Sequence, residues 1–321
     1  MSANWGGRPV PFPASAAFAV RLAPQPGLPA PIVIPRAEIS AVERLTAGRR
    51  GRAEVEEALR RVPQAARVVA VVGVAGSGRS TVAAELAVVA ASYQPGPVIV
   101  VDASGSVWPG ARCRFPPTSG SDLDWLRIRP LLARQDRVPA LGAFVHCVRH
   151  VEYRREVNGS EGWVTRLGGV PPSRPWEPVR PAEVLATVEA VRGLSRMTVV
   201  DCPADTDAVT RVCATVANVL VVVCRADAAE VRRCGQLVEV LSRDVRRDLT
   251  RRSVIVPVQH RPGRWPRAAA AAEAAAGRAV TAVRRLPFNR TLVDASTPVT
   301  HGVTAAKRLT AAVVLLSAQQ L

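Results

Sequence analysis

A glycine-rich segment between an apolar run and a helical stretch constrains this chain more than any other feature. Val68–Val72 lead into the sequence Gly73-Val-Ala-Gly-Ser-Gly-Arg-Ser-Thr81. Glycines at this spacing let backbone N–H groups turn inward around an anion, and a following helix N-terminus adds positive potential. The spacing is that of GxxxxGK[ST] phosphate loops, rather than of an ordinary strand-to-helix turn. The predicted nucleotide-binding residues here are Gly73, Gly76, Ser77, Gly78, Arg79, Ser80 and Thr81.

Short β-branched runs alternate with helical stretches along most of the chain. Continuous apolar strands separated by helices are typical of a parallel sheet covered on both faces. We therefore predict an α/β fold with a doubly wound, mostly parallel sheet. The expected strands are Val68–Val72, Val98–Val101, Met197–Val200, Val219–Val223 and Ser253–Val258. The expected helices are Ser80–Ala91, Pro181–Leu194, Ala228–Val245 and Arg267–Arg285.

The N-terminal region differs in composition from the rest. Residues 1–36 hold eight prolines, which block helices and central strands, and a helix is expected over Arg52–Arg61. We predict a Pro-rich arm and linker helix over 1–62, either a loose tail or a partner-docking segment. A nucleotide-binding domain follows over 63–321. Its stretch 105–180 is rich in Pro, Gly, Arg and Trp, which predicts an elaborated connection.

An aspartate follows each of two predicted strands. Asp102 ends the run Val98-Ile-Val-Val, and Asp201 ends Met197-Thr-Val-Val. An acidic residue at the carboxyl end of a buried strand beside a phosphate loop can hold magnesium or its waters, although a single such residue often only caps a turn. We predict a Mg²⁺ site formed by Ser80, Asp102 and Asp201.

Taken together, these segments resemble the MinD/ParA group of P-loop ATPases. The resemblance rests on the order of the phosphate loop, VIVVDAS, TVVDCPAD, ANVLVVVCRAD and RRLPFNR, and covers roughly residues 65–321. It implies a cytoplasmic switch that dimerises around ATP and hydrolyses it, positioning DNA, division sites or secretion machinery. Actinobacterial MinD-like proteins are similar, and some of them accompany type VII secretion or conjugation systems.

The resemblance also implies roles for particular residues. Arg79, Asp102 and Asp201 would be catalytic, with Ser80 and the two aspartates around the metal. Gln259 stands where the family has an adenine-contacting asparagine. The turn at Pro287 and Phe288 would lie along the adenine.

Four positions depart from the family pattern, and all four touch the triphosphate or its cleavage. Arg79 replaces the loop lysine, and Val74 replaces the lysine that reaches the partner's nucleotide. Ser104 stands in place of a water-positioning acid, and Asp205 in place of a glycine that senses the γ-phosphate. Losing a cation and a carboxylate removes transition-state stabilisation, so hydrolysis is expected to be slow or absent. The alternative is a nucleotide-binding scaffold without turnover.

Positive charge is concentrated in the later part of the chain. The segment from Arg225 to Arg290 holds 15 arginines and 6 acidic residues, so it carries +9 of the net charge of +17. The cluster could bind DNA nonspecifically, as in a partition factor, or an acidic protein or anionic lipid. It could equally be solvated helix ends in an arginine-biased chain, in which Lys307 is the only lysine. Its members are Arg243, Arg246, Arg247, Arg251 and Arg252.

Composition excludes several classes of protein. Hydrophobic residues make up 48% of the 321, which excludes wholesale disorder, and no run of about 20 apolar residues predicts a membrane-spanning helix. The first residues lack a secretory pattern, and six cysteines without a CxxC pair are expected as reduced thiols in the cytoplasm. A metal site at His146 and His150 is the less favoured interpretation of that segment. Val303–Leu316 is expected to be a helix that closes the sheet rather than a membrane-binding tail.

Overall fold

The computed structural model describes most of the chain from residue 51 onward, and all statements below concern these residues. The described residues are 51–60, 67–105, 114–115, 124–134, 150–157, 160–169, 178–204, 206–290, 299 and 304–318. The predicted proline-rich arm, Cys113, His146, Cys147 and Asp205 lie outside them.

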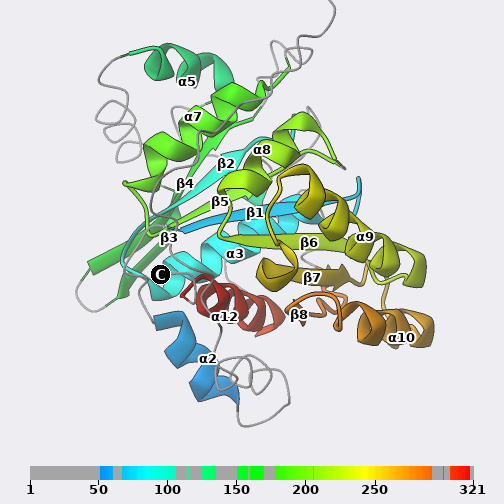
Figure 1. Ribbon diagram of the computed structural model, residues 1–321. Coiled ribbons are helices and arrows are strands. Elements are labelled where there is room, and N and C mark those ends of the chain that lie inside the picture. Colours follow the sequence, from blue (N-terminus) through cyan, green and yellow to red (C-terminus); the bar gives the residue numbers. More distant parts are fainter. Residues whose placement is uncertain are drawn as a thin grey trace, which may run out of the picture. The chain divides into compact units, whose positions relative to one another are not determined.

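An eight-stranded sheet forms the centre of the molecule, in the order β3-β4-β2-β5-β1-β6-β7-β8 (Figure 1). All neighbours are parallel except β3, which pairs antiparallel with β4. The predicted α/β class and the parallel sheet are therefore confirmed. The strands are β1 (Arg67–Gly73), β2 (Gly96–Asp102), β3 (His150–Val157), β4 (Ser160–Gly168), β5 (Met197–Asp201), β6 (Val219–Arg225), β7 (Ser253–Val258) and β8 (Ala282–Val283).

Helices cover both faces of the sheet, as a parallel sheet with apolar residues on both faces requires. In β1, Val68, Ala70 and Val72 belong to the core on one face, with α7, α8 and α9. Val69 and Val71 belong to the core on the other face, with α3 and α12. The helices are α2 (Gly51–Arg60), α3 (Arg79–Tyr93), α5 (Trp125–Leu132), α7 (Pro181–Arg192), α8 (Ala208–Val216), α9 (Ala228–Asp244), α10 (Arg267–Ala276) and α12 (Thr304–Ala318), with the 3₁₀ turn η1 (Thr250–Arg252).

The C-terminal helix α12 is integrated into the core, as the sequence predicts. Ala306 and Ala311 pack with Val55 and Leu59 of α2 and with Tyr93 of α3. Arg67, at the start of β1, donates a hydrogen bond to the Val314 carbonyl of α12 at 2.7 Å. No helix in the described ranges is both long and apolar enough to cross a membrane.

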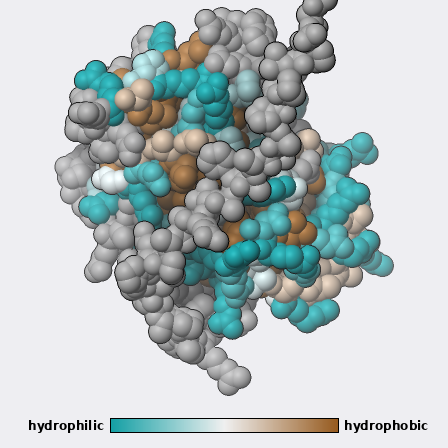
Figure 2. Space-filling view, turned by 45° about the horizontal axis from the view of Figure 1, so that its top comes forward, coloured by the Kyte–Doolittle hydropathy of each residue, from teal (hydrophilic) through white to brown (hydrophobic). Residues whose placement is uncertain are grey.

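The structure corrects the expected bounds of one helix. The helix expected over 267–285 ends at Ala276, because Gly277 caps it and the chain then forms the edge strand β8. Within the stretch predicted as an elaborated connection, 105–180, the described residues form α5, β3 and β4, and β4 pairs parallel with β2. Hydrophilic side chains predominate on the described surface around α9 and α10 (Figure 2).

We predict that Gly162→Ala destabilises the protein by roughly 1–3 kcal/mol, the range expected for overpacking. A Cβ at Gly162 would lie 2.1 Å from the Ala91 carbonyl oxygen and 2.5 Å from that of Gln94, both backbone atoms at the end of α3. Urea unfolding measures the change. Gly235→Ala in α9 is the matched control, because its Cβ meets nothing within 4 Å and alanine favours a helix. Equal stability of the two variants would contradict the prediction.

Candidate nucleotide site

The phosphate loop connects the central strand β1 to α3. Gly73, Gly76 and Gly78 have φ values of 144°, 71° and 94°, a region that disfavours side chains. A Cβ at Gly73 would lie 2.0 Å from the Val223 carbonyl oxygen of β6, so only glycine fits at the start of the loop. The loop therefore has the backbone conformation that the sequence pattern requires, with the N-terminus of α3 directly behind it.

The two predicted aspartates lie side by side at the carboxyl edge of the sheet. Asp102 of β2 and Asp201 of β5 are register partners, next to the end of β1. Asp102 accepts hydrogen bonds from the Ser104 backbone N–H at 3.2 Å and from its hydroxyl at 2.7 Å. Ser104 therefore orients Asp102. The resemblance to the MinD/ParA group implied a water-positioning acid at this position, which is a different role.

Asp201 is the more deeply buried of the two carboxylates of the site. Its side chain is fully buried, and the Ser80 hydroxyl approaches the carboxylate as a donor without reaching the geometry of a full hydrogen bond. Burial raises the pKa of Asp201 to about 7, with Asp102 contributing and Ser80 and Arg79 opposing. A fully buried carboxylate and the neighbouring Ser80 hydroxyl provide the oxygen donors that Mg²⁺ prefers. The residues present therefore fit the predicted magnesium site.

Arg79 reaches across the loop to the end of β5. Its guanidinium donates a hydrogen bond of 2.6 Å to the Cys202 carbonyl oxygen, and its charge opposes the raised pKa of Asp201. The side chain is half-buried. The arginine thus places a cation near the Asp201 carboxylate while one of its donors is held by the backbone.

The segment after β7 contacts both the phosphate loop and the predicted adenine turn. The Gln259 side-chain oxygen accepts from the Phe288 N–H at 3.4 Å, and its amide donates to the Gly263 carbonyl at 3.1 Å. The next residue, His260, places a ring nitrogen 3.2 Å from the Ser77 carbonyl oxygen. The structure thus brings Gln259 and Phe288 together, with Pro287 in the same turn. Sequence reasoning missed His260, although its place directly after a central strand was a usable indication.

The basic cluster around the end of α9 is only partly a free surface. Arg247 is half-buried and donates to the Thr215 and Ala217 carbonyls at the end of α8, at 2.8 and 2.9 Å. Burial lowers the pKa of Arg247 to about 10. Arg251 pairs with Asp248, and Arg243 and Arg246 are exposed.

The cysteines and histidines do not form a metal site in the described ranges. Cys202, Cys213, Cys224 and Cys234 are buried free thiols, as expected for reduced cysteines. No cluster of three or more metal-binding side chains occurs within the part of the chain that the structure describes. His150 begins β3, which agrees with a strand in this segment.

No protein-family model and no curated protein sequence matches the chain. Solved structures do match its fold. A ParA family ATPase from Chlorobium tepidum is 18% identical with a TM-score of 0.54, over 72% of this chain and 89% of that one. The cell division ATPase MinD of Pyrococcus furiosus is 16% identical with a TM-score of 0.53, over 79% and 98%. The Aquifex aeolicus MinC:MinD complex is 15% identical with a TM-score of 0.50, over 79% and 94%. The chain therefore has the fold of the MinD and ParA ATPases, as the sequence resemblance predicts.

We predict that, in the absence of nucleotide and Mg²⁺, the Asp201→Asn variant is more stable than wild type. The difference in stability should increase as the pH rises. The unfolded pKa is about 3.9, and the folded pKa is about 7. Between these values only the folded state holds the proton, so wild-type stability falls as pH rises through this window. The advantage of the variant in Tm should therefore grow from pH 4.5 to 7 and then level off.

Asp248→Asn is the control of opposite sign. The Thr250 hydroxyl lowers the pKa of Asp248, so this carboxylate stabilises the folded state above its unfolded pKa. Its asparagine variant should lose stability relative to wild type as pH rises from acid. An Asp201→Asn advantage that is constant with pH would contradict the prediction.

Proposed function

We propose that this protein is a nucleotide-dependent switch of the MinD/ParA kind, which binds ATP with Mg²⁺ and hydrolyses it slowly. The observation that carries the proposal is the fully buried Asp201 carboxylate, whose pKa is raised to about 7 by burial, next to the Ser80 hydroxyl and a glycine loop shaped for phosphates. A site with an uncompensated acid at that point is completed by a cation. The MinD/ParA fold gives independent support.

Each group has a distinct task in this proposal. The loop N–H groups and Arg79 bind the phosphates, while Ser80, Asp201 and Asp102 hold the metal. When bound, Mg²⁺ supplies charge neutralisation between the phosphates. Ser104 keeps Asp102 oriented. The 259–260 segment holds the phosphate loop and the turn at Pro287 and Phe288, along which the adenine lies.

Hydrolysis is slow in this proposal because two charged groups of the family pattern are missing. Val74 gives no cation to a partner's nucleotide, and Ser104 gives no carboxylate to orient water. Preorganised charges of this kind account for much of the rate of phosphoryl transfer. ATP-dependent dimerisation and the positioning of a cellular machine, such as secretion, conjugation, division or DNA segregation, belong to the same proposal.

The basic surface is a smaller candidate than the sequence suggests. Of the five clustered arginines, Arg247 caps α8 and Arg252 is half-buried. The exposed ones are Arg243, Arg246 and Arg251, the last paired with Asp248. This surface lies where α9 ends, at the sheet edge opposite the phosphate loop. Nonspecific DNA or an acidic protein remains the proposed partner class for it.

We predict that Mg-ATP binds the wild-type chain and that Gly78→Val abolishes the binding. Gly78 has a φ of 94° at the N-terminus of α3, which a β-branched residue disfavours, so the loop cannot keep its shape. Isothermal titration calorimetry measures the affinity. Gly193→Ala is the matched control, because a Cβ there meets nothing within 4 Å and its backbone is helical. Absence of ATP binding by a folded wild-type chain would refute the switch.

We predict that Arg79→Ala weakens ATP binding about tenfold, because a charge-assisted hydrogen bond to phosphate is lost, whereas Arg79→Lys should retain the affinity. Calorimetry measures both affinities, and equal affinities of the two variants would contradict the prediction.

We predict slow phosphate release from wild type, with kcat below about 1 per second, the low end for enzymes. A phosphate-release assay with Gly78→Val as baseline makes the measurement. Binding without release above that baseline would favour the non-hydrolysing scaffold.

A further inference from the structure

His260 contacts the phosphate loop from the end of β7. One of its ring nitrogens, Nε2, lies 3.2 Å from the Ser77 carbonyl oxygen. A carbonyl oxygen only accepts hydrogen bonds, so Nε2 must carry a proton, as it does in the imidazolium and in one tautomer of the neutral ring. The ring is half-buried and also borders Gly78, because a Cβ at Gly78 would lie 3.8 Å from Nε2.

Ser77 is held through its backbone rather than through its side chain. Its N–H donates to the Val74 carbonyl at 3.3 Å, while its own carbonyl accepts from His260. The Ser77 hydroxyl is buried and has no hydrogen-bond partner among the described residues. The direction of the Ser77 carbonyl is therefore set by the contact with His260.

The direction of this carbonyl decides where the next N–H group points. Because a trans peptide bond is planar, the Ser77 C=O and the Gly78 N–H point in opposite directions. A carbonyl turned toward His260 thus turns the Gly78 N–H away from the end of β7. That N–H has no backbone acceptor within the described ranges. Unpaired N–H groups in a glycine-rich turn are the groups that bind the oxygens of an anion.

His260 follows a strand that is fixed on both sides. Strand β7 pairs with β6 as far as Val258, whose carbonyl accepts from the Ala226 N–H at 2.8 Å. The next residue, Gln259, donates its N–H to the Leu286 carbonyl at 2.9 Å. A fixed donor matters, because ligand affinity improves when the binding groups are held in place before the ligand arrives.

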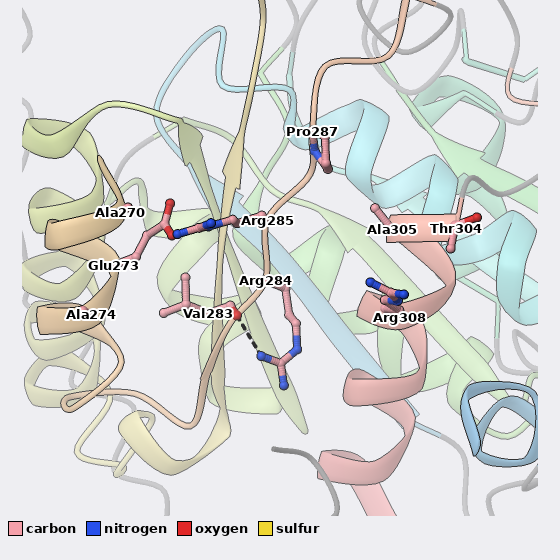
Figure 3. A pocket seen from close by; sticks show the side chains of 10 residues that line it. All are labelled: Ala270, Glu273, Ala274, Val283, Arg284, Arg285, Pro287, Thr304, Ala305 and Arg308. Atoms are coloured by element: carbon pink, nitrogen blue, oxygen red, sulfur yellow. Dashed lines mark hydrogen bonds and ion pairs between the residues drawn. The ribbon is translucent and has the colours of Figure 1, made fainter. Parts of the chain in front are cut away.

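The turn after Leu286 depends on the same short segment. Pro287 lines a cavity of about 670 Å³ between α10 and α12, so this part of the turn is not packed closely against other elements (Figure 3). The Gln259 side-chain oxygen holds the turn by accepting from the Phe288 N–H at 3.4 Å. Two consecutive residues after β7 thus contact the predicted adenine turn and the phosphate loop.

We propose that His260 is a positioning residue of the nucleotide site, whose Nε2–H holds the Ser77 carbonyl and so aims the Gly78 N–H at the phosphates. The inference rests on the proposed function, because it assigns the phosphates of a nucleotide to this loop. In this role His260 touches neither the nucleotide nor the metal. It acts through the backbone of the loop.

Calorimetric titration of Mg-ATP into full-length variants tests the role of His260. His260→Ala should weaken binding about tenfold, because the hydrogen bond that holds the loop is lost. His260→Gln should restore most of the affinity, since the glutamine amide nitrogen can occupy the place of Nε2. His260→Asn should not, because its shorter side chain places the amide nitrogen nearer to Nδ1. Gln236→Ala, at an exposed polar residue of α9, is the control and should bind as wild type does.

Thermal unfolding checks that each variant is folded, and the pair of Gln and Asn variants decides the question if the alanine variant is not. Long-range ¹H–¹⁵N NMR at pH 8, where an ordinary histidine is neutral, reports the tautomer of His260 without any nucleotide. We expect the Nε2–H tautomer, identified by the signal that His260→Gln removes.

The outcomes separate this inference from the proposed function. Absence of Mg-ATP binding by folded wild type would refute the proposed function and the role of His260 with it. Wild-type binding that His260→Ala leaves unchanged would overturn the role of His260 alone. So would equal losses in His260→Gln and His260→Asn, which would indicate packing rather than a hydrogen bond, or an Nδ1–H tautomer in the ligand-free protein.

Discussion

The parallel, in-register pairing of β1, β2 and β5 is the constraint on which the rest of the site depends. Because β5 lies between β1 and β2, the carboxyl ends of all three strands meet at one edge of the sheet. That arrangement brings Asp102 and Asp201 together and puts both beside the phosphate loop. Burial of Asp201 raises its pKa, and repulsion from the Asp102 carboxylate raises it further. The packing that stabilises the sheet thus holds a desolvated carboxylate beside a second one, and a bound cation would offset their negative charge.

The sequence predicted the parts of the fold that depend on local pattern. Five central strands and the helix α3 follow from apolar runs and glycine spacing, and the structure has them within a few residues of the expected bounds. The adjacency of Asp102 and Asp201 was also predictable, since each ends a buried strand. The individual roles were not, because the pairing of Ser104 with Asp102 and of Arg79 with Cys202 depends on side-chain directions.

The failures have a common physical reason, which is that tertiary contacts override local preference. The alanines of 268–276 favour a helix, but Gly277 ends it and pairing with β7 makes Ala282–Val283 a strand. In β4 the buried Arg166 interrupts the apolar pattern that is typical of a buried strand. Its guanidinium is accommodated there by donating a hydrogen bond to the Gly168 carbonyl at 3.1 Å. Gly277 was a stop signal readable from the sequence, whereas the β8 strand depends on pairing with β7 and could not be read from the residues around it.

The net charge of +17 overstates the positive surface of the protein. Several arginines turn their guanidinium groups to backbone carbonyls at the ends of strands and helices: Arg67 to Val314, Arg79 to Cys202, Arg247 to Thr215 and Ala217, and Arg284 to Val283. Burial lowers the pKa of three of them, Arg67, Arg247 and Arg284, to about 10. A planar fork with five donors can satisfy a carbonyl and still bind an anion, which an ammonium group does less well. The density of arginines along the sequence is therefore a poor guide to the positive surface, because backbone carbonyls hold several of these guanidinium groups.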